Sequence, residues 1–412
     1  MNYFYYRKNQ LFCEDVSVSK LANIYGTPLY IYSTRTIKEH YRRLKEAFPS
    51  TLICYSLKAN SNLAICRIIS KLGAGFDVVS GGEIYRILKI RANPAKIVFA
   101  GVGKTAEEIE YALRNNIMML NTESIDEIQT TEQIACRLKR VVPVALRINP
   151  DVEPHTHRYI ITGTEETKFG FPLSDAKRII AMMRSFKHIR FIGLHIHIGS
   201  QITETVPYLK ALKKVLPLVE YAKRLGYPLK YLDIGGGLGI FYKGAEAKKA
   251  SDFGAVIMPI IKKLNLKLII EPGRFIVGNA GIIVTRIIRT KTSGQNNFII
   301  CDAGMNTLIR PALYDAYHRI EPVKRKNIRN KIKANIVGPI CESGDFLAKN
   351  RFLPRVAQND LLAIFSAGAY GYSMVSNYNS RPKPAEVLVS GRHHKLITRG
   401  ERYSDLIKLE IQ

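Results

Sequence analysis

The stretch TLICYSLKAN, residues 51–60, is a short apolar run with a lysine near its end. The run from Thr51 to Leu57 has the length and apolar character of a buried β-strand, and Lys58 follows at the point where that strand would end. A lysine is strongly hydrated and is seldom placed against a buried strand. It is either an amine that extends into solvent or a desolvated amine that forms a Schiff base with an aldehyde. This stretch alone leaves both interpretations open.

Seven more apolar, β-branched runs follow, and each except the last is followed by a stretch with helical periodicity. They lie at residues 75–80, 97–102, 117–122, 142–150, 191–200, 231–237 and 266–274. Strands that alternate with helical crossovers form a parallel sheet whose two faces are covered. Eight such units close a (β/α)8 barrel. The alternative is an open, doubly wound sheet, which often has fewer parallel strands.

The residues at the ends of these runs distinguish the two kinds of sheet. Nearly every run ends in polar residues or glycines: Lys58, Asp77, Ser80, Asn121, Arg147, Asn149, His197, Ser200, Gly235, Glu271 and Arg274. In a closed barrel, the carboxyl ends of the strands converge on the one face that holds the active site, whereas an open sheet would spread them along a line. We therefore predict a barrel with these side chains at its mouth.

The pattern changes after Arg274, where β-rich runs separated by turn residues replace the alternation of strands and helices. We predict two domains with the fold class α/β plus β. The (β/α)8 barrel covers residues 34–275, and residues 1–33 and 276–412 form a second, mostly antiparallel β domain. The N-terminal segment Leu29–Tyr32 is expected to pair with strands of that second domain.

Composition excludes several classes of protein. The chain has 412 residues, of which 46% are hydrophobic, and no apolar run approaches the roughly 20 residues of a membrane helix. Its first residues lack the layout of a secretory signal, and its six cysteines are scattered without metal-binding spacing, so we expect a reducing cytoplasm without disulfides or a structural metal. The net charge is +28, but the basic residues are dispersed, which favours a solvated surface over nucleic-acid binding.

Three run ends carry groups that suit a phosphate. The sequence GGGLG, Gly235–Gly239, directly follows a predicted strand, where glycines let backbone N–H groups approach an anion. Tight turns between strands and helices use glycine too, so this motif is weak evidence by itself. Gly273 and Arg274 add an amide and a guanidinium, and Ser200 adds a hydroxyl. Together they predict a phosphate site at the barrel mouth.

Two histidines and a glutamate suggest how a flat ring could be bound. His195 and His197 lie two residues apart, on the same face of a strand, with His197 nearer the mouth. His197 could stack on an aromatic ligand; the alternatives are a core histidine satisfied by a neighbour, or a metal pair, for which no third ligand is evident. Glu271 ends the eighth run, and a carboxylate there would keep a pyridine nitrogen protonated.

Taken together, the motifs resemble those of the diaminopimelate decarboxylase family, in the alanine-racemase-like (fold type III) branch of pyridoxal-phosphate enzymes. They extend over nearly the whole chain and read YSLKAN, FDVVSGGE, RINPDV, HIHIGSQ, GGGLG, EPGR, GPICESGD and AGAYGYSMVSNYN. The resemblance implies decarboxylation of meso-2,6-diaminopimelate to L-lysine with pyridoxal 5'-phosphate. Single motifs also occur in ornithine and arginine decarboxylases of this fold. Another decarboxylase, acting on ornithine, arginine or carboxynorspermidine, and a non-enzymatic carrier of the cofactor therefore stay open as alternatives.

The resemblance also implies which residues bind the cofactor: Lys58, His197, Ser200, Gly236, Gly237, Glu271, Gly273, Arg274 and Tyr370. Lys58 would hold the cofactor covalently, His197 would stack on its ring, and Glu271 would face the pyridine nitrogen. The other residues would bind the phosphate. Asp77 and Glu83 lie at strand and helix ends and are supporting candidates.

The substrate residues implied by the resemblance are Arg274, Arg310, Tyr314, Glu342, Tyr370 and Tyr378. Arginines bind a carboxylate through two parallel hydrogen bonds, and a glutamate matches an ammonium group. Cys341 would donate the proton that replaces the lost carboxylate, so the implied catalytic residues are Lys58, His197 and Cys341. In the family, the positions of Cys341 and Glu342 enter the site from a second subunit. A homodimer with shared active sites is therefore expected, with no metal, nucleic acid or membrane.

Overall fold

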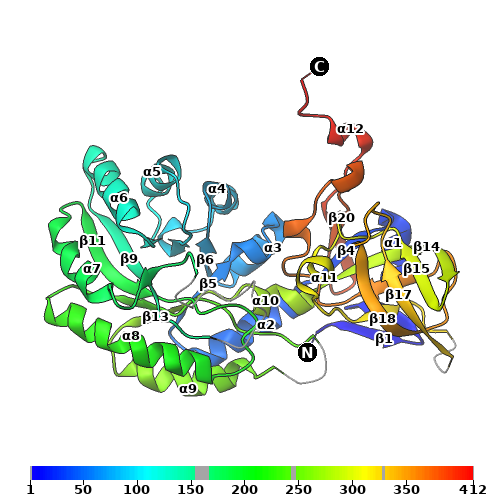
Figure 1. Ribbon diagram of the computed structural model, residues 1–412, viewed down its shortest axis with the longest axis horizontal. Coiled ribbons are helices and arrows are strands. Elements are labelled where there is room, and N and C mark those ends of the chain that lie inside the picture. Colours follow the sequence, from blue (N-terminus) through cyan, green and yellow to red (C-terminus); the bar gives the residue numbers. More distant parts are fainter. Residues whose placement is uncertain (1, 154–166, 243–246, 327–329, 412) are drawn as a thin grey trace. The chain divides into compact units, whose positions relative to one another are not determined.

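The computed structural model describes residues 2–153, 167–242, 247–326 and 330–411. The chain divides into two compact units (Figure 1). The barrel unit comprises His40–Ile240 and Ala247–Phe275, and the β unit comprises Met1–Glu39, Phe241–Glu246 and Ile276–Gln412. The predicted domain boundaries at residues 34 and 275 stay a prediction, because helices run through the residues at which the units change.

The barrel unit contains a closed parallel sheet. Its eight strands are β5 (Leu52–Ser56), β6 (Gly75–Val78), β7 (Ile97–Phe99), β8 (Met119–Thr122), β9 (Val142–Asn149), β11 (Ile189–His195), β12 (Tyr231–Asp233) and β13 (Lys267–Ile270). Each strand pairs in parallel with its neighbours, and the pairings of β13 with β5 and of β8 with β9 complete the ring. This confirms the predicted (β/α)8 barrel and excludes the open sheet. A two-residue strand, β10 (Phe171–Pro172), pairs with β9 as an addition.

Helices connect these strands, as the alternating sequence pattern predicted. They are α2 (Thr34–Ala47), α3 (Leu63–Lys71), α4 (Gly81–Lys89), α5 (Ala106–Arg114), α6 (Ile125–Arg137), α7 (Ala176–Met182), α8 (Val206–Arg224), α9 (Ala250–Lys262) and α10 (Arg274–Val277). Side chains at several N-termini accept hydrogen bonds from the first turn, among them Ser80 from the Glu83 amide and Ser124 from the Glu127 amide. These caps begin α4 and α6 within three residues of the end of the preceding strand, which leaves the residues between strand and helix at the barrel mouth.

Inside the barrel, apolar side chains from six strands pack together: Cys54, Val98, Met119, Ala145, Ile192 and Ile269. The strands are buried on both faces because helices cover the outside (Figure 1). Continuous apolar runs are therefore favoured over alternating ones, which is why they could be recognised in the sequence.

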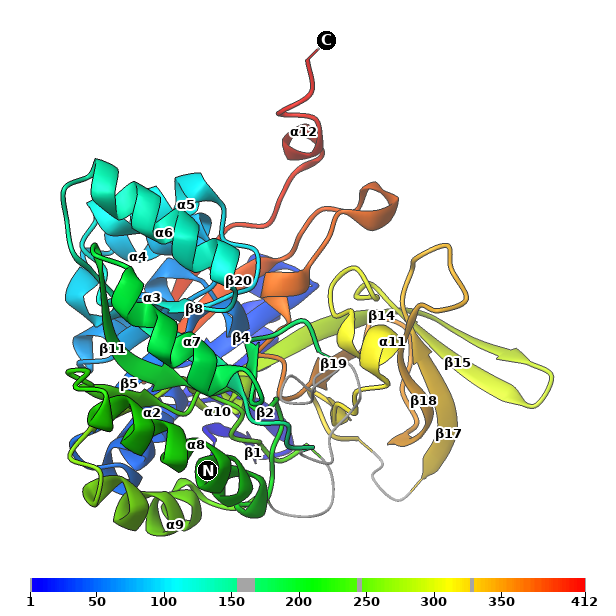
Figure 2. The same ribbon diagram turned by 60° about the vertical axis from the view of Figure 1, so that its left-hand side comes forward.

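The β unit is built on a mixed sheet with the strand order β18-β17-β15-β14-β4-β20-β21 (Figure 2). These strands are β4 (Leu29–Ser33), β14 (Gly281–Ser293), β15 (Asn296–Cys301), β17 (Lys331–Val337), β18 (Phe346–Pro354), β20 (Ala385–Ser390) and β21 (His393–Thr398), and β14 also pairs with β19 (Leu361–Ile364), which pairs with β16 (Ile320–Pro322). The N-terminal strand β4 lies between β14 and β20, as predicted. Most pairings are antiparallel, but β15–β17 and β4–β20 are parallel.

The remaining elements of the β unit are short. A three-stranded sheet contains β1 (Phe4–Arg7), β2 (Gln10–Cys13) and β3 (Val16–Ser17), and the helices are α1 (Val18–Tyr25), α11 (Arg310–Tyr314) and α12 (Tyr403–Leu406). All six cysteines lie in the described segments and are free thiols. Among the described helices, none combines the length and apolarity needed to cross a membrane.

One glycine provides a test of how closely the barrel helices pack. Gly254 lies inside α9, and a Cβ built there would be 2.1 Å from the backbone carbonyl oxygen of Ala47. Alanine is normally the better helix residue, but a backbone oxygen cannot rotate out of the way, so we expect Gly254→Ala to destabilise the protein by about 1–3 kcal/mol. The urea midpoint measures this effect. Gly103→Ala is the control, since a Cβ there meets nothing within 4 Å; equal midpoints for the two variants would contradict the close packing.

Candidate active site

Lys58 is held against a buried carboxylate at the barrel mouth. It lies in a 3-10 turn, Leu57–Ala59, directly after β5, and its Nζ is 2.6 Å from Oδ2 of Asp77 at the end of β6. Ser56 donates a second hydrogen bond to the same oxygen, at 2.7 Å. Burial raises the pKa of Asp77 and the charge of Glu271 adds to this, whereas the Lys58 ammonium opposes it. The Lys58 side chain is 37% exposed, so its amine is ion-paired and still accessible.

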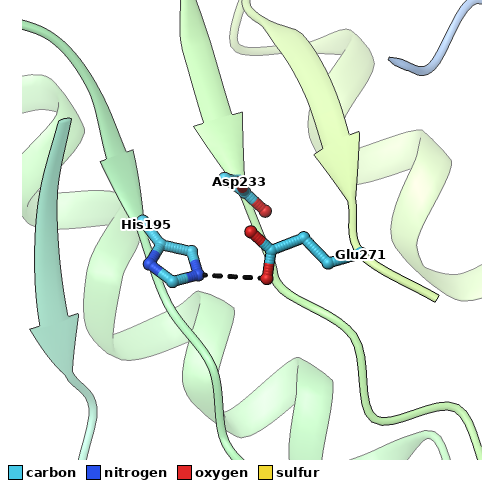
Figure 3. Close-up of side chains that lie close together, drawn as sticks. All are labelled: His195, Asp233 and Glu271. Atoms are coloured by element: carbon cyan, nitrogen blue, oxygen red, sulfur yellow. Dashed lines mark ion pairs between the residues drawn. The ribbon is translucent and has the colours of Figure 1, made fainter. Parts of the chain in front are cut away.

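Three buried side chains form a cluster at the ends of adjacent strands, namely His195 on β11, Asp233 on β12 and Glu271 after β13 (Figure 3). His195 Nε2 lies 3.4 Å from Glu271 Oε2. Burial alone would raise the pKa of Glu271, but the ion pair with His195 and the nearby Lys58 hold this pKa below its usual range. Glu271 is therefore a buried carboxylate that stays ionised because it is paired.

Asp233 faces Glu271 and has the opposite tendency (Figure 3). Burial raises its pKa well above the usual value and the charge of Glu271 adds to this, although the Gly235 amide donates a hydrogen bond to Asp233 Oδ1 at 2.9 Å. Two adjacent carboxylates cannot both ionise readily, so the proton resides on Asp233. The sequence analysis did not identify Asp233, although an acid at the end of the run YLDIGGG was a usable signal.

His195 also belongs to a group of three potential metal ligands. One ligand atom from each of His195, Asp233 and Glu271 lies within 4.8 Å of the others. Strand closure brings these residues together, which sequence spacing could not reveal. His197 is not a member of this group, so the pair of His195 and His197 has no third metal ligand among the described residues.

The two histidines have different environments, which separates the interpretations left open by the sequence. His195 is buried and its Nε2 lies near Glu271, but neither of its ring nitrogens makes a hydrogen bond within the described residues. His197 lies beyond the end of β11, where its Nδ1 accepts a hydrogen bond from the Gly236 amide at 3.2 Å. Burial lowers the pKa of His197 well below its usual value, and the charges of Arg147 and Lys58 add to this. His197 is therefore a neutral, flat ring, which suits stacking.

The three run ends predicted to bind phosphate pack closely against one another. Arg274 Nη2 donates to Ser200 Oγ at 2.9 Å. Gly237 has a φ of +99°, and a Cβ there would lie 2.5 Å from the carbonyl oxygen of Gly199; a Cβ at Gly236 would lie 2.2 Å from that of Glu271. Glycine is required at both positions by this packing. A hydroxyl, a guanidinium and a glycine turn thus lie together and fit a phosphate group.

Two further buried ion pairs support the mouth. Arg147 Nη1 lies 2.7 Å from Glu123 Oε1, and Lys104 Nζ lies 2.6 Å from Glu127 Oε1. Glu127 in turn accepts a hydrogen bond from the Glu123 amide at 3.0 Å. The sequence analysis identified Arg147 as a strand-end residue but not its partners. Glu83, the other supporting candidate, accepts from the Val79 amide at 2.9 Å, and burial raises its pKa to about 7.

The remaining predicted site residues belong to the β unit. Arg310 and Tyr314 lie on α11, and the Arg310 guanidinium is 6.0 Å from the Tyr314 ring centroid. Cys341 and Glu342 are both exposed. The Cys341 amide donates to Asn379 Oδ1 at 2.8 Å, and a hydrogen bond to Glu342 raises the pKa of Tyr378. Cys341 and Glu342 therefore form one loop cluster with Tyr378 and Asn379.

Asp345 and Tyr370 complete this part of the β unit. The buried Asp345 carboxylate accepts hydrogen bonds from the amides of Ile340 at 2.7 Å and Met305 at 2.6 Å, which ties the loop of Cys341 to the segment that leads to α11. Tyr370 has a left-handed backbone, with a φ of +54°. What these residues bind stays a prediction.

Comparisons with known proteins agree with this arrangement. Residues 34–278 match the family model for the pyridoxal-dependent decarboxylase, pyridoxal binding domain. The chain is 46% identical to diaminopimelate decarboxylase from Aquifex aeolicus, over 98% of this chain and 97% of the relative. It is 44% identical to that from Haemophilus influenzae, over 100% and 99%.

Solved structures give the same result. Diaminopimelate decarboxylase from Helicobacter pylori, complexed with L-lysine, matches with a TM-score of 0.92 and 40% identity, over 95% of this chain and 98% of that one. The M. jannaschii enzyme, in co-complex with L-lysine, matches with a TM-score of 0.94 and 38% identity, over 99% and 98%. Because this likeness extends over nearly the whole of both chains, the protein belongs to the diaminopimelate decarboxylase family of fold type III pyridoxal-phosphate-dependent decarboxylases.

Proposed function

We propose that this protein decarboxylates meso-2,6-diaminopimelate to L-lysine and CO2 with pyridoxal 5'-phosphate, the reaction that completes lysine biosynthesis. The observation that carries this proposal is identity of 44–46% to curated diaminopimelate decarboxylases over almost the full chain. The likeness includes the β unit, where the predicted substrate residues lie, and not only the cofactor-binding barrel. The reaction replaces a carboxylate with a proton at the same carbon.

The barrel residues fit the cofactor. Lys58 would hold it covalently, and the neutral ring of His197 would stack on it. Ser200, Gly236, Gly237, Gly273 and Arg274 would bind its phosphate, and Tyr370 of the β unit is a further predicted phosphate residue. Glu271 is buried and stays ionised, which suits it to face the pyridine nitrogen. When bound, pyridoxal phosphate supplies an electron sink for the bond that breaks.

Glu271 matters because it remains ionised while buried. A carboxylate beside the ring nitrogen keeps that nitrogen protonated, which increases its capacity to accept electrons. Asp233 retains its own proton, so the two carboxyl groups together carry one negative charge beside His195. The ion pair of Lys58 with Asp77 similarly fixes the position of the Lys58 amine.

The predicted substrate residues match the distal end of the substrate. Diaminopimelate carries a carboxylate and an ammonium group at the end that does not react. Arg274, Arg310 and Tyr314 would bind the carboxylate and Glu342 the ammonium, with Tyr370 and Tyr378 alongside. The thiol of Cys341 would donate its proton to the carbon that has lost CO2. A thiol that performs this step must be accessible, and Cys341 is exposed in the chain.

We further propose a homodimer in which Cys341 and Glu342 of each subunit complete the active site of the other. Both residues are exposed, and a hydrogen bond between Tyr378 and Glu342 holds the loop without burying it. An exposed, ordered loop that carries reactive groups is typical of a segment that acts on a partner. The expected cytoplasmic location stays a prediction.

A substrate panel tests the proposed function. We expect the protein loaded with pyridoxal phosphate to release CO2 from meso-diaminopimelate and to form lysine. The alternative substrates, ornithine, arginine and carboxynorspermidine, lack the distal amino-acid end or present it differently. Their kcat/KM should therefore be lower than that of meso-diaminopimelate by at least about 100-fold, because one buried charged group of the protein would lose its partner. Measured CO2 release decides this. Equal or faster turnover of ornithine or arginine would contradict the assignment.

Removing the charge of Glu271 should disable the reaction while leaving the cofactor bound. Glu271→Gln keeps the shape of the side chain but cannot keep the ring nitrogen protonated, so we expect kcat to fall by roughly 10²–10⁴-fold. Visible absorbance measures bound cofactor and CO2 release measures kcat. Glu132→Gln is the control, since Glu132 pairs with His188 away from the mouth. A Glu271→Gln enzyme within threefold of wild type would refute this role.

Mixed dimers test the shared active site. Lys58→Ala and Cys341→Ala should each be inactive as homodimers, but a mixture that exchanges subunits should recover about a quarter of wild-type activity, because half of the dimers then contain one intact site. Activity after coexpression measures the recovery. Lys58→Ala mixed with Glu271→Gln is the control and should not recover, since both changes are in the barrel unit. No recovery in the first mixture would contradict the shared site.

A further inference from the structure

A buried histidine lies directly against Arg310 in the β unit. His318 is 0% exposed and lies between α11 and β16, eight residues after Arg310, which is 6% exposed. Arg310 Nε donates to His318 Nε2 at 3.4 Å. On the other side of the ring, His318 Nδ1 lies 2.9 Å from the carbonyl oxygen of Phe365, directly after β19. The imidazole thus connects Arg310 to the sheet.

These two contacts fix the protonation of His318. A carbonyl oxygen only accepts, so Nδ1 must carry a hydrogen and donate it to Phe365. A guanidinium only donates, so Nε2 must present its lone pair to Arg310. Both contacts therefore require the neutral tautomer with hydrogen on Nδ1. A doubly protonated ring would place an N–H and a positive charge against the Arg310 guanidinium.

Aromatic rings add to the restraint on the Arg310 guanidinium. Its central carbon lies 5.5 Å from the ring centroid of Tyr242 and 6.0 Å from that of Tyr314. The Tyr242 ring also packs edge-on against His318, with centroids 5.5 Å apart at an interplanar angle of 80°. Two rings and an imidazole therefore limit how the guanidinium can rotate.

We propose that His318 is a positioning residue that fixes Arg310 for the distal carboxylate of the substrate. This inference rests on the proposed function, in which Arg310 binds that carboxylate. A carboxylate in place of His318 would orient Arg310 equally well but would cancel its charge. A neutral imidazole orients the guanidinium without placing a negative charge beside it.

Two substitutions separate this role from simple packing. Gln places its amide oxygen near the position of Nε2, so His318→Gln keeps the acceptor for Arg310 and loses the donor to Phe365. Asn places its amide nitrogen near the position of Nδ1, so His318→Asn keeps the donor and loses the acceptor. Both variants leave one buried contact unmade, and thermal unfolding should show similar losses of stability.

Steady-state kinetics then give different results for the two variants. We expect His318→Asn to raise KM for meso-diaminopimelate roughly 10-fold, because a hydrogen bond to a charged group is lost, with kcat within about twofold of wild type. His318→Gln should keep KM within about threefold of wild type. Arg310→Ala sets the full effect of losing the guanidinium, and His188→Asn, in the barrel unit, is the control. An unchanged KM in His318→Asn, or equal KM increases in both variants, would overturn the proposal.

A measurement without substrate keeps this inference separate from the proposed function. In 15N-histidine NMR spectra of the whole protein at neutral pH, the signal lost in His318→Gln should be that of a neutral ring with its hydrogen on Nδ1. A hydrogen on Nε2, or a cationic ring, would overturn the proposal whatever the substrate proves to be. The two tests can also disagree. If wild-type protein shows the Nδ1–H tautomer of His318 but does not turn over diaminopimelate, the proposed function is refuted and the contact between His318 and Arg310 is supported.

Discussion

Closure of the parallel sheet is the constraint on which the rest of the site depends. The pairings of β13 with β5 and of β8 with β9 join the first and last strands into a ring, so that strand ends far apart in sequence meet at one mouth. Lys58 and Asp77 come from adjacent strands, and so do His195, Asp233 and Glu271. Without closure, each of these groups would be an isolated charge or polar group at the end of an apolar strand, which is costly to bury.

Charged side chains lie close together at the barrel mouth, and most of them are neutralised in ion pairs. Lys58 pairs with Asp77, His195 with Glu271, Arg147 with Glu123 and Lys104 with Glu127. Each pair lowers the cost of burying its members, and Asp233 avoids that cost by keeping its proton. The charges of the site are therefore held in fixed positions before the cofactor binds. Charges fixed in this way can stabilise a transition state without the side chains having to rearrange during the reaction. The neutral histidines, His197 at the mouth and His318 beside Arg310, position groups without adding charge.

Much of this could be predicted from the sequence, and the reasons are physical. Strands covered on both faces are continuous apolar runs, so all eight were found, and Lys58 was conspicuous because it interrupts one. The prediction was less exact where the chain leaves the sheet: residues 191–200 were taken as one run, but β11 spans Ile189–His195. Asp233, Glu123 and His318 were missed because their partners are distant in sequence. His318 and Phe365 are 47 residues apart, and only the folded chain brings them together.

The central claim is that one amine, that of Lys58, holds the cofactor at the mouth of the closed barrel. Borohydride reduction of the protein saturated with pyridoxal phosphate fixes the cofactor to whichever amine carries it, and peptide mass mapping then locates the label. The account predicts a single phosphopyridoxyl group on the peptide that contains Lys58, at about one per chain. A label on any other lysine, or no label at saturating cofactor, would contradict it.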